Sequence, residues 1–562
     1  MSSELVFNVM AFGAVGDGAT DDTQAIYNAI AAASAIATTT AHQTVYFPRG
    51  RYYINSPSYQ LTPASYVTLQ GEGMFSSTIL AGAAFAVGAI LRSSAAYSDF
   101  IIQDLGFDTG GHAGIGWIVA NTYGHTNWLI ARCRFANLNG ISNTTASWGL
   151  NIGGGDGTTQ TCSNMQLRNN FFDATYSGTS NTYETALAVS WIDSSIVENY
   201  FYDQWTGAQC VLGIYGFGAR INVFGNAFNQ CSGSYYAINH TDVDCRDNTH
   251  YMTLAGGPIG EGANSVYIAN CVKLRIRGER FICGITSSTE PIWGIRVVDG
   301  PTFDGYDVTY ANSYDLFFDG CTFDSYQFGI QIGGGSSGGT MAMTDIYVTN
   351  CRFLNMVNAG FYLNGNSTSG QARIVVDGCS APATALASGG WSIVEIDAPS
   401  GNTISDITIK NCKIGAITGT STSAIGCEVA GTGAIFTVVN NDFSGNTNPV
   451  RGGGAKLALV RGNAGFNPVG ELTGTAPLPG APAFPASGTA TTPCAFDCTV
   501  IPTAGTSPIT AVQIGGVISP YATIPGYTVA ASSSGSPIRV PAGQQLKYTY
   551  AAGSPSHTWF GE

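Results

Sequence analysis

The segment LIARCRF, residues 129–135, recurs along the chain as QLRNNFF (166–172), SIVENYF (195–201) and NVFGNAF (222–228). Later copies are LFFDGCTF (316–323), IYVTNCRF (346–353), ITIKNCKI (407–414) and FTVVNNDF (436–443). In each copy, alternating apolar residues precede an Asn or Cys, and a Phe or Ile usually follows two positions later. Self-similarity at a roughly constant period of about 20–50 residues is the signature of a solenoid.

The Asn or Cys of each copy marks the repeat, and it falls at Cys133, Asn170, Asn199, Asn226, Cys271, Cys321, Cys351, Cys379, Cys412 and Asn441. Most intervals are 27 to 37 residues, as expected for one coil of two or three short strands, while the two intervals flanking Cys271 are 45 and 50 residues and predict insertions. A second strand also recurs, as GLNIGGG from Gly149, GIRVVDG from Gly294 and GIQIGGG from Gly329. The sequence therefore predicts an all-β fold, a right-handed parallel β-helix.

Like residues of successive coils stack about 4.8 Å apart in such a fold. Stacked Asn side chains can hydrogen-bond from coil to coil, and a small Cys fills the same interior position as a modest hydrophobe. We therefore interpret the marker cysteines as packed thiols. Cys494 and Cys498 lie outside the repeat, and whether they pair is left open.

Both ends of the solenoid have their own signals. Asp21 followed by Gln24 is a capping-box pattern, and Ile26, Ala29, Ile30 and Ala33 share one face of the helix that follows. We expect residues 1–75 to form the cap and first coils, 76–474 the β-helix, 475–487 a linker rich in Pro, Ala and Gly, and 488–562 a small antiparallel β module.

Composition limits the functions to consider. Lys and Arg number 22 against 36 Asp and Glu, a net charge of −14, which has the wrong sign for neutralising phosphates and argues against nucleic acid as a partner. The chain shows no secretion signal and no apolar run of membrane-spanning length, so we expect a soluble product without membrane insertion. Metal-binding C-x-x-C clusters are absent, and neither a metal nor a cofactor is expected.

The stretch FNVMAFGAVGDGATDDTQAIYNAI (7–30), with TVYFPRGRYYI (44–54) and VTLQGEG (67–73), resembles the opening of pectate-lyase-like β-helix proteins. That group includes polygalacturonase-like hydrolases, lyases, epimerases and bacteriophage tailspikes. The resemblance covers the first 75 residues by motif and residues up to 474 by repeat. In this motif Asp17, Asp21 and Asp22 are expected to serve turns and the helix cap. Neither a polygalacturonase-like trio of Asp motifs nor an Asp ladder for calcium is present.

Among these groups the chain most resembles the tailspikes, because it has few charges, unpaired cysteines and an appended β module. That resemblance implies a homotrimer in a virion tail, beside other phage tail proteins, which binds and often cleaves a bacterial surface polysaccharide. Two alternatives stay open: a tail protein or adhesin that binds glycan without cutting it, and a bacterial polysaccharide hydrolase or lyase with an extracellular or cell-surface location.

Hydrolysis of a glycosidic bond needs two carboxylates, and neighbouring coils of a β-helix can supply them. The first candidate region is HTDVDCRDNTH, which concentrates charge in an otherwise uncharged chain: His240, Asp242, Asp244, Arg246, Asp247 and His250. The alternative is a solvated loop with internal ion pairs. Glu184 and Asp193, in coils nearby, flank a strand that carries Trp191 and are candidates to complete the catalytic surface.

The second candidate pair is Glu395 and Glu428, which we expect at the same outward position of successive coils; a column that also holds Arg296, Gln331 and Tyr362 fits a plain polar face as well. For substrate binding, the aromatic candidates are Trp191, Trp205 and Trp293, whose rings suit sugar stacking or packing between coils. A lyase would use a base beside a charge neutraliser, and His240 with Arg246 or Arg296 offers that combination. The residues do not separate lyase from hydrolase.

Overall fold

The computed structural model describes residues 4–85, 88–93, 95–112, 114–138, 149–153, 161–174, 186–203, 212–216, 218–231, 233–253, 263–285, 291–298, 302–303, 306–307, 313–333, 343–364, 371–386, 391–398, 404–419, 424–429, 435–446, 450–453, 456–464, 485–491, 498–516, 520–541, 544–551 and 553–561. The chain divides into two compact units, Met1–Gly339 and Thr340–Glu562. The expected linker lies mostly outside the described residues.

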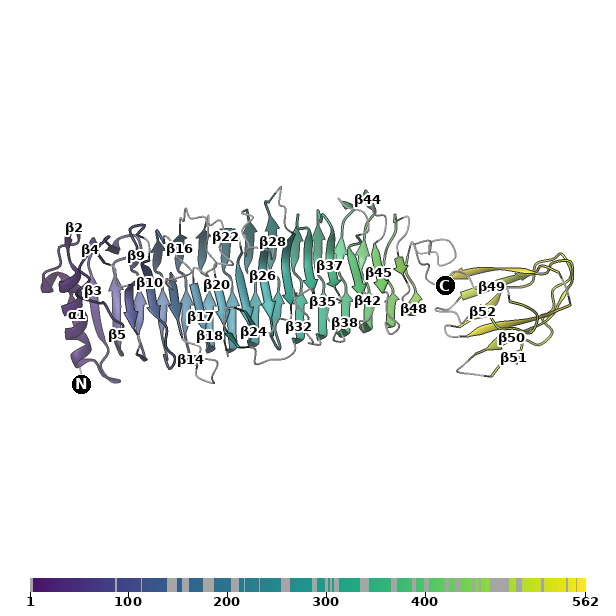
Figure 1. Ribbon diagram of the computed structural model, residues 1–562, viewed down its shortest axis with the longest axis horizontal. Helices are drawn as coiled ribbons and strands as arrows, with labels where there is room; N and C mark the ends of the chain where they lie inside the picture. The colour runs from purple at the N-terminus through teal and green to yellow at the C-terminus, as the bar shows by residue number, and fades with distance from the viewer. Residues whose placement is uncertain are drawn as a thin grey trace. The chain divides into compact units, whose positions relative to one another are not determined.

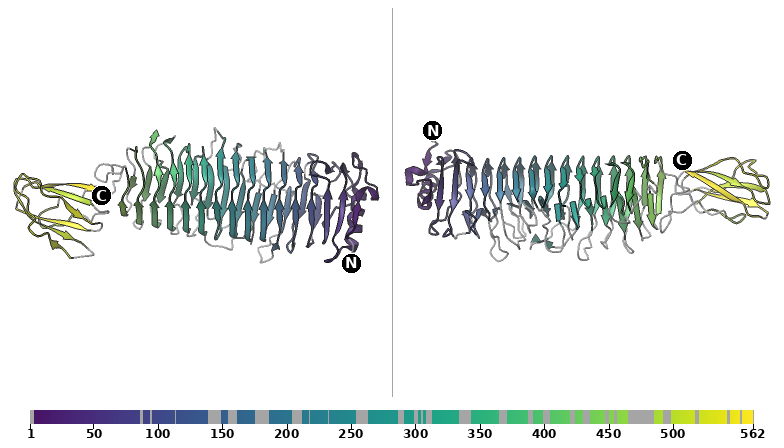
Figure 2. Two further views of the ribbon diagram at one scale, coloured as in Figure 1. Left: turned by 180° about the vertical axis from the view of Figure 1, so that it is seen from behind. Right: turned by 90° about the horizontal axis from the view of Figure 1, so that it is seen from above.

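The first unit is a parallel β-solenoid with three sheets, named A, B and C, and the third sheet begins after the first two coils (Figures 1 and 2). Sheet A holds β1 (Val6–Asn8), β3 (Gln43–Phe47), β5 (Val67–Gly71), β8 (Ile101–Gln103), β11 (Leu129–Ala131), β14 (Cys162–Ser163), β15 (Gln166–Arg168), β18 (Trp191–Val197), β21 (Ala219–Phe224), β24 (Thr241–Arg246), β27 (Arg275–Arg277) and β32 (Tyr314–Asp319).

Sheet B holds β2 (Asp17–Asp21), β4 (Gly50–Ile54), β6 (Ser77–Ala81), β9 (Gly106–Asp108), β12 (Arg134–Ala136), β16 (Phe171–Ala174), β19 (Tyr200–Asp203), β22 (Ala227–Cys231), β25 (Thr249–Met252), β28 (Arg280–Cys283) and β33 (Thr322–Asp324). Sheet C holds β7 (Ala89–Ser93), β10 (Gly116–Ala120), β13 (Leu150–Ile152), β17 (Ala186–Val189), β20 (Leu212–Tyr215), β23 (Tyr235–Ile238), β26 (Ala263–Ala269), β29 (Ile292–Val298) and β34 (Phe328–Ile332). A short hairpin joins β30 (Thr302–Phe303) to β31 (Tyr306–Asp307).

The second unit begins with three parallel strand series of the same kind. Their strands are β35 (Thr344–Thr349), β38 (Gln371–Asp377), β42 (Ile404–Lys410), β46 (Ile435–Val439) and β48 (Lys456–Arg461); β36 (Arg352–Leu354), β39 (Ser380–Ala381) and β43 (Lys413–Ile414); and β37 (Ala359–Asn364), β41 (Val394–Ala398), β45 (Ile425–Val429) and β47 (Val450–Gly453). A further parallel pair is β40 (Thr384–Leu386) with β44 (Ile417–Gly419). The predicted parallel β-helix is confirmed.

The C-terminal residues form two three-stranded antiparallel sheets, as predicted. Their strands are β52 (Ile538–Val540), β49 (Cys498–Thr503) and β54 (Ser556–Gly561), and β51 (Ala522–Thr523), β50 (Ile509–Gly515) and β53 (Gln545–Tyr550). Buried Val500, Val512, Leu546 and Tyr548 belong to one apolar cluster of this module. Cys494 lies outside the described residues, so the question of a Cys494–Cys498 pair stays open.

The N-terminal helix α1 (Thr23–Ile36) packs against β1, β3 and the short 3-10 helix η1 (Val9–Phe12). Its buried face includes Ile26, Ala29, Ile30 and Ala33, as predicted. The predicted capping box is wrong, because Asp22 occupies the N-cap position and makes no side-chain cap bond. Asp22 instead accepts the main-chain N–H groups of Val15 and Gly16, while Asp21 accepts that of Thr23, so these carboxylates serve turns.

Inside the first unit, one aromatic ring per coil stacks on the next beneath sheet B. The rings belong to Phe107, Phe135, Phe172, Phe201, Phe228, His250, Phe281 and Phe323, with centroids 4.3–5.5 Å apart. Since residues alternate between the two faces of a strand, the residues on either side of each stacked ring point outward from sheet B. This register fixes which side chains sheet B presents on its outer face.

At the corner between sheets A and B, the predicted Asn ladder is present. Asn170 Nδ2 donates to Asn199 Oδ1, Asn199 Nδ2 to Asn226 Oδ1, and Asn226 Nδ2 to Asn248 Oδ1, at 2.9–3.0 Å. The residue that follows each marker donates its N–H to the marker carbonyl of the previous coil: Thr249 to Asn226, Arg280 to Asn248 and Thr322 to Glu279.

This bonding corrects the predicted marker series. The markers after Asn226 are Asn248 and Glu279, not Cys271. Val272, the residue after Cys271, donates to the His240 carbonyl, so Cys271 belongs to a different corner of the coil. With Asn248 and Glu279 as markers, the intervals from Asn226 to Cys321 become 22, 31 and 42 residues, so only the last is longer than the other coils. All ten described free cysteines, Cys271 included, are buried, in agreement with packed thiols.

Candidate functional site

The charged stretch HTDVDCRDNTH does not converge on one site. His240 and His250 are fully buried. Asp244 and Arg246 lie on the outer face of β24 in sheet A, and Asp242 has a positive φ of 55° at the start of that strand. Burial lowers the pKa of His240 to about 4, and its Nδ1 lies 2.9 Å from the Ile238 carbonyl oxygen. A neutral, enclosed imidazole cannot serve as the predicted surface base.

The acidic candidates on sheet A are engaged in ion pairs with the following coil. The Asp193 carboxylate accepts hydrogen bonds from Nε and one terminal nitrogen of Arg220, at 2.5 and 2.8 Å. This guanidinium lowers the pKa of the Asp193 carboxyl. Asp244 is held in the same way by Arg277, at 2.7–3.2 Å. Bidentate pairs of this kind fix carboxylate orientation and occupy both oxygens.

The same face shows a regular alternation of charge. At equivalent positions of successive coils, one residue has a left-handed backbone conformation with positive φ. These residues are Asp193, Arg220, Asp242, Lys273 and Asp315. Opposite charges on neighbouring coils stabilise the stacking, whereas like charges would oppose it. This arrangement corresponds to the alternative of a solvated face with internal ion pairs.

The prediction that Glu395 and Glu428 occupy the same outward position is wrong. In the register of the strands, Glu395 pairs with Tyr362 and Gly426, whereas Glu428 pairs with Asp397. Glu428 therefore lies two residues farther along β45 than Gly426, the residue that pairs with Glu395. Glu395 is also almost fully buried, as is Tyr362, whose ring meets Trp391 edge-on at 4.9 Å.

The remaining candidates are buried or outside the described residues. Trp191 is 1% exposed, and its Nε1 donates to the Ile152 carbonyl. Trp293 is also buried, with the Arg296 guanidinium 4.5 Å above its ring, and Arg296 pairs in register with Gln331 as expected. Glu184 and Trp205 lie outside the described residues.

A different pair of acids lies on the outer face of sheet B. Asp108 and Asp173 both pair in register with Ala136, one from each side, so their strands are two coil spacings or about 9.6 Å apart. Asp108 Oδ1 accepts the Gly110 N–H and Asn137 Nδ2, both at 2.8 Å. Ala136 lies between them in the register and is itself fully buried.

Two arginines orient these acids. Arg134, beside Ala136 on β12, donates to Asp173 Oδ2 at 2.6 Å. The Arg51 guanidinium lies 4.0 Å from Asp108 Oδ2. The Asp173 and Arg134 side chains are 27% and 26% exposed, whereas that of Asp108 is 8% exposed, so Asp173 is the more open of the two acids.

Aromatic rings line the same face. Phe75 is 66% exposed and lies 5.5 Å from the Arg134 guanidinium and 5.9 Å from the Phe171 ring. Phe171 stacks on Tyr200 at 5.3 Å with an interplanar angle of 2°. Tyr251, 37% exposed, faces outward two coils beyond β19. Exposed aromatic faces of this kind suit contact with the C–H faces of sugar rings.

Gly106 allows Phe75 to reach this face. A Cβ at Gly106 would lie 2.8 Å from the Met74 carbonyl oxygen, closer than any side chain tolerates. The segment carrying Phe75 therefore crosses directly over β9. We name the surface formed by Phe75, Asp108, Arg134, Phe171, Asp173, Tyr200 and Tyr251 the acid–aromatic face.

Sequence reasoning missed this face, although the repeat contained its signal. The residue directly after each stacked Phe points outward, and at that position the chain reads Asp108 in GFD and Asp173 in FFD. Aligning the copies on the Phe and reading one residue farther would have brought the two acids together.

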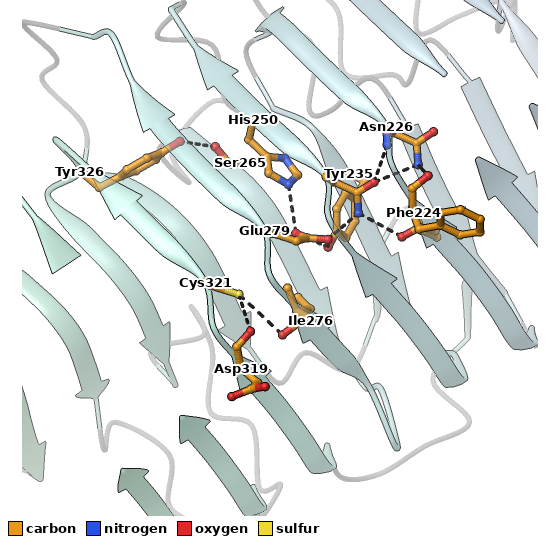
Figure 3. A network of polar contacts seen from close by, with 12 residues as sticks. Phe224, Asn226, Tyr235, His250, Ser265, Ile276, Glu279, Asp319, Cys321 and Tyr326 are labelled. Atoms are coloured by element: carbon orange, nitrogen blue, oxygen red, sulfur yellow. Dashed lines mark hydrogen bonds and ion pairs between the residues drawn. The ribbon is translucent and has the colours of Figure 1, made fainter. Parts of the chain in front are cut away.

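A third acid, Glu279, is buried and has a structural role (Figure 3). Glu279 is 1% exposed and accepts hydrogen bonds from Asn248 Nδ2 at 2.5 Å and from the Tyr235 hydroxyl at 3.2–3.3 Å, while His250 Nε2 lies 3.0 Å from its Oε2. These partners come from sheet C, sheet B and the ladder corner, so Glu279 links the interior faces of the coil. Its enclosure excludes contact with a polysaccharide.

Among the residues that the structure describes, no cluster of three or more His, Cys, Asp or Glu side chains is placed to hold a metal ion. Within the same residues, no helix has the length and apolar character needed to cross a membrane.

Comparisons with known proteins bear on the family. Residues 6–256 match the family model described as rhamnogalacturonase A/epimerase, pectate lyase-like. A probable glucan endo-1,3-beta-glucosidase of Arthroderma benhamiae is 27% identical over 41% of this chain, which spans only 27% of that protein.

Solved structures that are similar to this chain include the following two. The A-module of a mannuronan C-5 epimerase from Azotobacter vinelandii is 15% identical, covering 82% of this chain and 98% of its own, with a TM-score of 0.42. The pre-mature gene product 12 of bacteriophage phi29 is 13% identical, covering 79% and 66%, with a TM-score of 0.45. Residues 6–256, somewhat less than half of the chain, are thus similar to the pectate-lyase-like family, and the parallel solenoid agrees with that similarity.

Proposed function

We propose that this protein binds a bacterial surface polysaccharide along the acid–aromatic face and cleaves it by hydrolysis. The observation that carries the proposal is the combination on one outer face of two carboxylates two coils apart with a row of aromatic rings. The superfamily includes polysaccharide-active enzymes, which is in keeping with this chemistry.

The spacing of the acids favours one stereochemical course. Inverting glycosidases hold their two carboxyl groups about 6.5–9.5 Å apart, so that a water molecule fits beside the sugar. The strands that carry Asp108 and Asp173 lie about 9.6 Å apart, which is just above that range and well above the roughly 5 Å that retention requires. In this proposal one carboxyl protonates the glycosidic oxygen and the other activates water, so the product anomer is inverted.

We further propose that the protein acts in a bacteriophage tail as a homotrimeric spike beside other tail proteins. The C-terminal antiparallel module and the tailspike-like opening motif support this role. Light scattering on the purified protein tests the trimer: we expect three times the chain mass of 58.4 kDa, and a monomer would contradict it.

A second candidate function is binding without cleavage. It is favoured by one observation, that Asp173 and Asp108 each have an arginine close by, which can hold both acids in a purely structural role.

A panel of capsular and O-antigen polysaccharides separates these functions. Hydrolysis yields new reducing ends without absorbance near 235 nm, whereas a lyase yields both. We expect reducing ends alone for at least one polysaccharide. Retained binding with no new ends would favour the adhesin, and absence of both binding and cleavage would contradict the proposal.

A further inference from the structure

We propose that the polysaccharide held by the acid–aromatic face is neutral over the stretch in contact with the protein. The inference rests on the proposed function and adds the class of substrate. It rests on where the basic residues around this face lie.

Between residues 75 and 280 the chain contains ten basic residues, at Arg92, Arg132, Arg134, Arg168, Arg220, Arg246, Lys273, Arg275, Arg277 and Arg280. Each of them lies in the described part of the chain. The segments of this region that the structure does not describe contain no Lys or Arg in their sequence, and so add no cation to the face.

Most of these cations belong to other surfaces. Arg168, Arg220, Arg246, Arg275 and Arg277 lie on strands of sheet A, and Lys273 lies at its corner. Arg92 lies on β7 of sheet C. Arg132 has a left-handed backbone at the corner between sheets A and B and is paired with Asp104 at 2.7 Å. Arg134 and Arg280 remain on sheet B, together with the earlier Arg51 and the exposed Arg49 directly before β4.

Of the two cations beside the acids, only Arg134 is closely paired, since the Arg51 side chain stays 63% exposed. Arg134 is paired with Asp173 at 2.6 Å, and Arg51 lies 4.0 Å from Asp108. Arg280 is exposed and pairs in register with Thr249, one coil beyond Tyr251, so it bounds the aromatic row. Between Asp173 and Arg280 the outward positions on sheet B are held by uncharged side chains: Tyr200, Tyr202, Ala227, Asn229, Thr249 and Tyr251.

This arrangement disfavours a polymer with a carboxylate on each sugar. Such a chain would find no unpaired guanidinium between the acids and Tyr251, and it would approach a protein of net charge −14. Neutral sugars carry no such penalty, since their C–H faces can lie on Phe75, Phe171 and Tyr251 and their hydroxyls can bond to amide and hydroxyl groups. Elimination chemistry, which acts on uronates, is disfavoured on the same ground.

The test uses matched pairs of polysaccharides. Each acidic member of the panel is compared with its carboxyl-reduced form, which keeps the backbone linkages and loses the charge, beside naturally neutral O-antigens. Binding is followed by affinity electrophoresis at NaCl concentrations from about 50 to about 500 mM, where the Debye length falls severalfold.

We expect the bound polysaccharides to be neutral, with affinity that changes less than about twofold across the salt range. Tyr251→Ala should weaken binding about tenfold, whereas Arg246→Ala on sheet A should leave it unchanged. Binding of an acidic polysaccharide that is lost on carboxyl reduction and falls steeply with salt would overturn the inference while leaving the proposed function intact. Failure to bind any member, charged or reduced, would refute the proposed function and the inference with it.

Discussion

Glu279 Oε2 lies 3.0 Å from His250 Nε2 in the interior of the solenoid, where the Asn ladder ends. His250 takes the place of a Phe in the stacked column, with ring centroids 5.2 Å from Phe228 and 4.3 Å from Phe281. Glu279 takes the place of an Asn in the ladder and accepts a hydrogen bond from Asn248 Nδ2. His250 and Glu279, the two residues that depart from the repeat, are thus hydrogen-bonding partners of each other. A buried carboxylate needs hydrogen-bond donors and a buried imidazole needs a hydrogen-bonding partner.

The first prediction concerns this buried carboxylate. Glu279→Ala should lower the free energy of unfolding by about 3–5 kcal/mol, because it leaves Asn248, Tyr235 and His250 without their shared acceptor. Thermal unfolding followed by circular dichroism measures the loss. Glu198→Ala, at a corner where the carboxylate bonds the exposed Asn169 amide, is the matched control and should cost less than about 1 kcal/mol. Equal effects of the two variants would show that the interior network is dispensable.

The Asn ladder gives the second prediction. Asn199 accepts the N–H and Nδ2 of Asn170 and donates to Leu167 O and Asn226 Oδ1. Asn199→Ala should destabilise the protein by about 2–4 kcal/mol, since buried groups on both neighbouring coils lose partners. Asn222→Ala, on the exposed face of β21, should be neutral under the same denaturant titration. An unaffected Asn199→Ala variant would mean that the ladder contributes nothing.

The third prediction is a pH dependence of stability. Burial holds the pKa of His240 at about 4 in the folded protein, below the value of about 6.5 expected for an unfolded chain. Only the unfolded state takes up this proton between those values, so stability is lost as pH falls from about 6.5 to about 4, by about 3 kcal/mol in all. Unfolding titrations at several pH values should show a shallower decline for His240→Asn. Parallel declines in the two proteins would rule out this assignment.

The sequence predicted the solenoid, its ladder and its C-terminal module because each depends on local alternation repeated many times. It did not predict the register wherever a marker changed its chemistry. Asn248 and Glu279 were not recognised as markers, and Cys271 was assigned to the wrong corner. The identity of a single polar residue does not show which corner of a coil it occupies. The candidate site was missed for a related reason: Asp108 and Asp173 are 65 residues apart, and only the pairing of both with Ala136 makes them neighbours.

The fourth prediction distinguishes the two sets of acids. Asp108→Asn and Asp173→Asn should each reduce hydrolysis by about 100–10,000-fold while polysaccharide binding persists, because an amide neither donates nor removes the reacting proton. Asp193→Asn, which alters only an exposed pair with Arg220, should keep the wild-type rate. Reducing-end assays on the three variants decide the matter. Full activity in both sheet B variants, or its loss in Asp193→Asn, would move the catalytic site away from this face.

The fifth prediction concerns the exposed Phe75 ring of the acid–aromatic face. Phe75→Ala should weaken polysaccharide affinity about tenfold through loss of a ring that is 66% exposed. Its melting temperature should not change, since an exposed side chain contributes little to the core. Tyr314→Ala, which removes a ring that is 43% exposed from sheet A, is the control for non-specific effects and should bind normally. Matching losses of affinity in both variants would indicate diffuse adsorption rather than a defined site.

The most direct measurement is a crystal structure of the protein with an oligosaccharide obtained from a polysaccharide that it binds. We predict density for the sugar chain on the outer face of sheet B, with rings against Phe75, Phe171 or Tyr200 and a glycosidic oxygen between Asp108 and Asp173. An oligosaccharide bound instead to sheet A, to the outer face of sheet C or to the C-terminal module alone would contradict the assignment of the acid–aromatic face as the functional site.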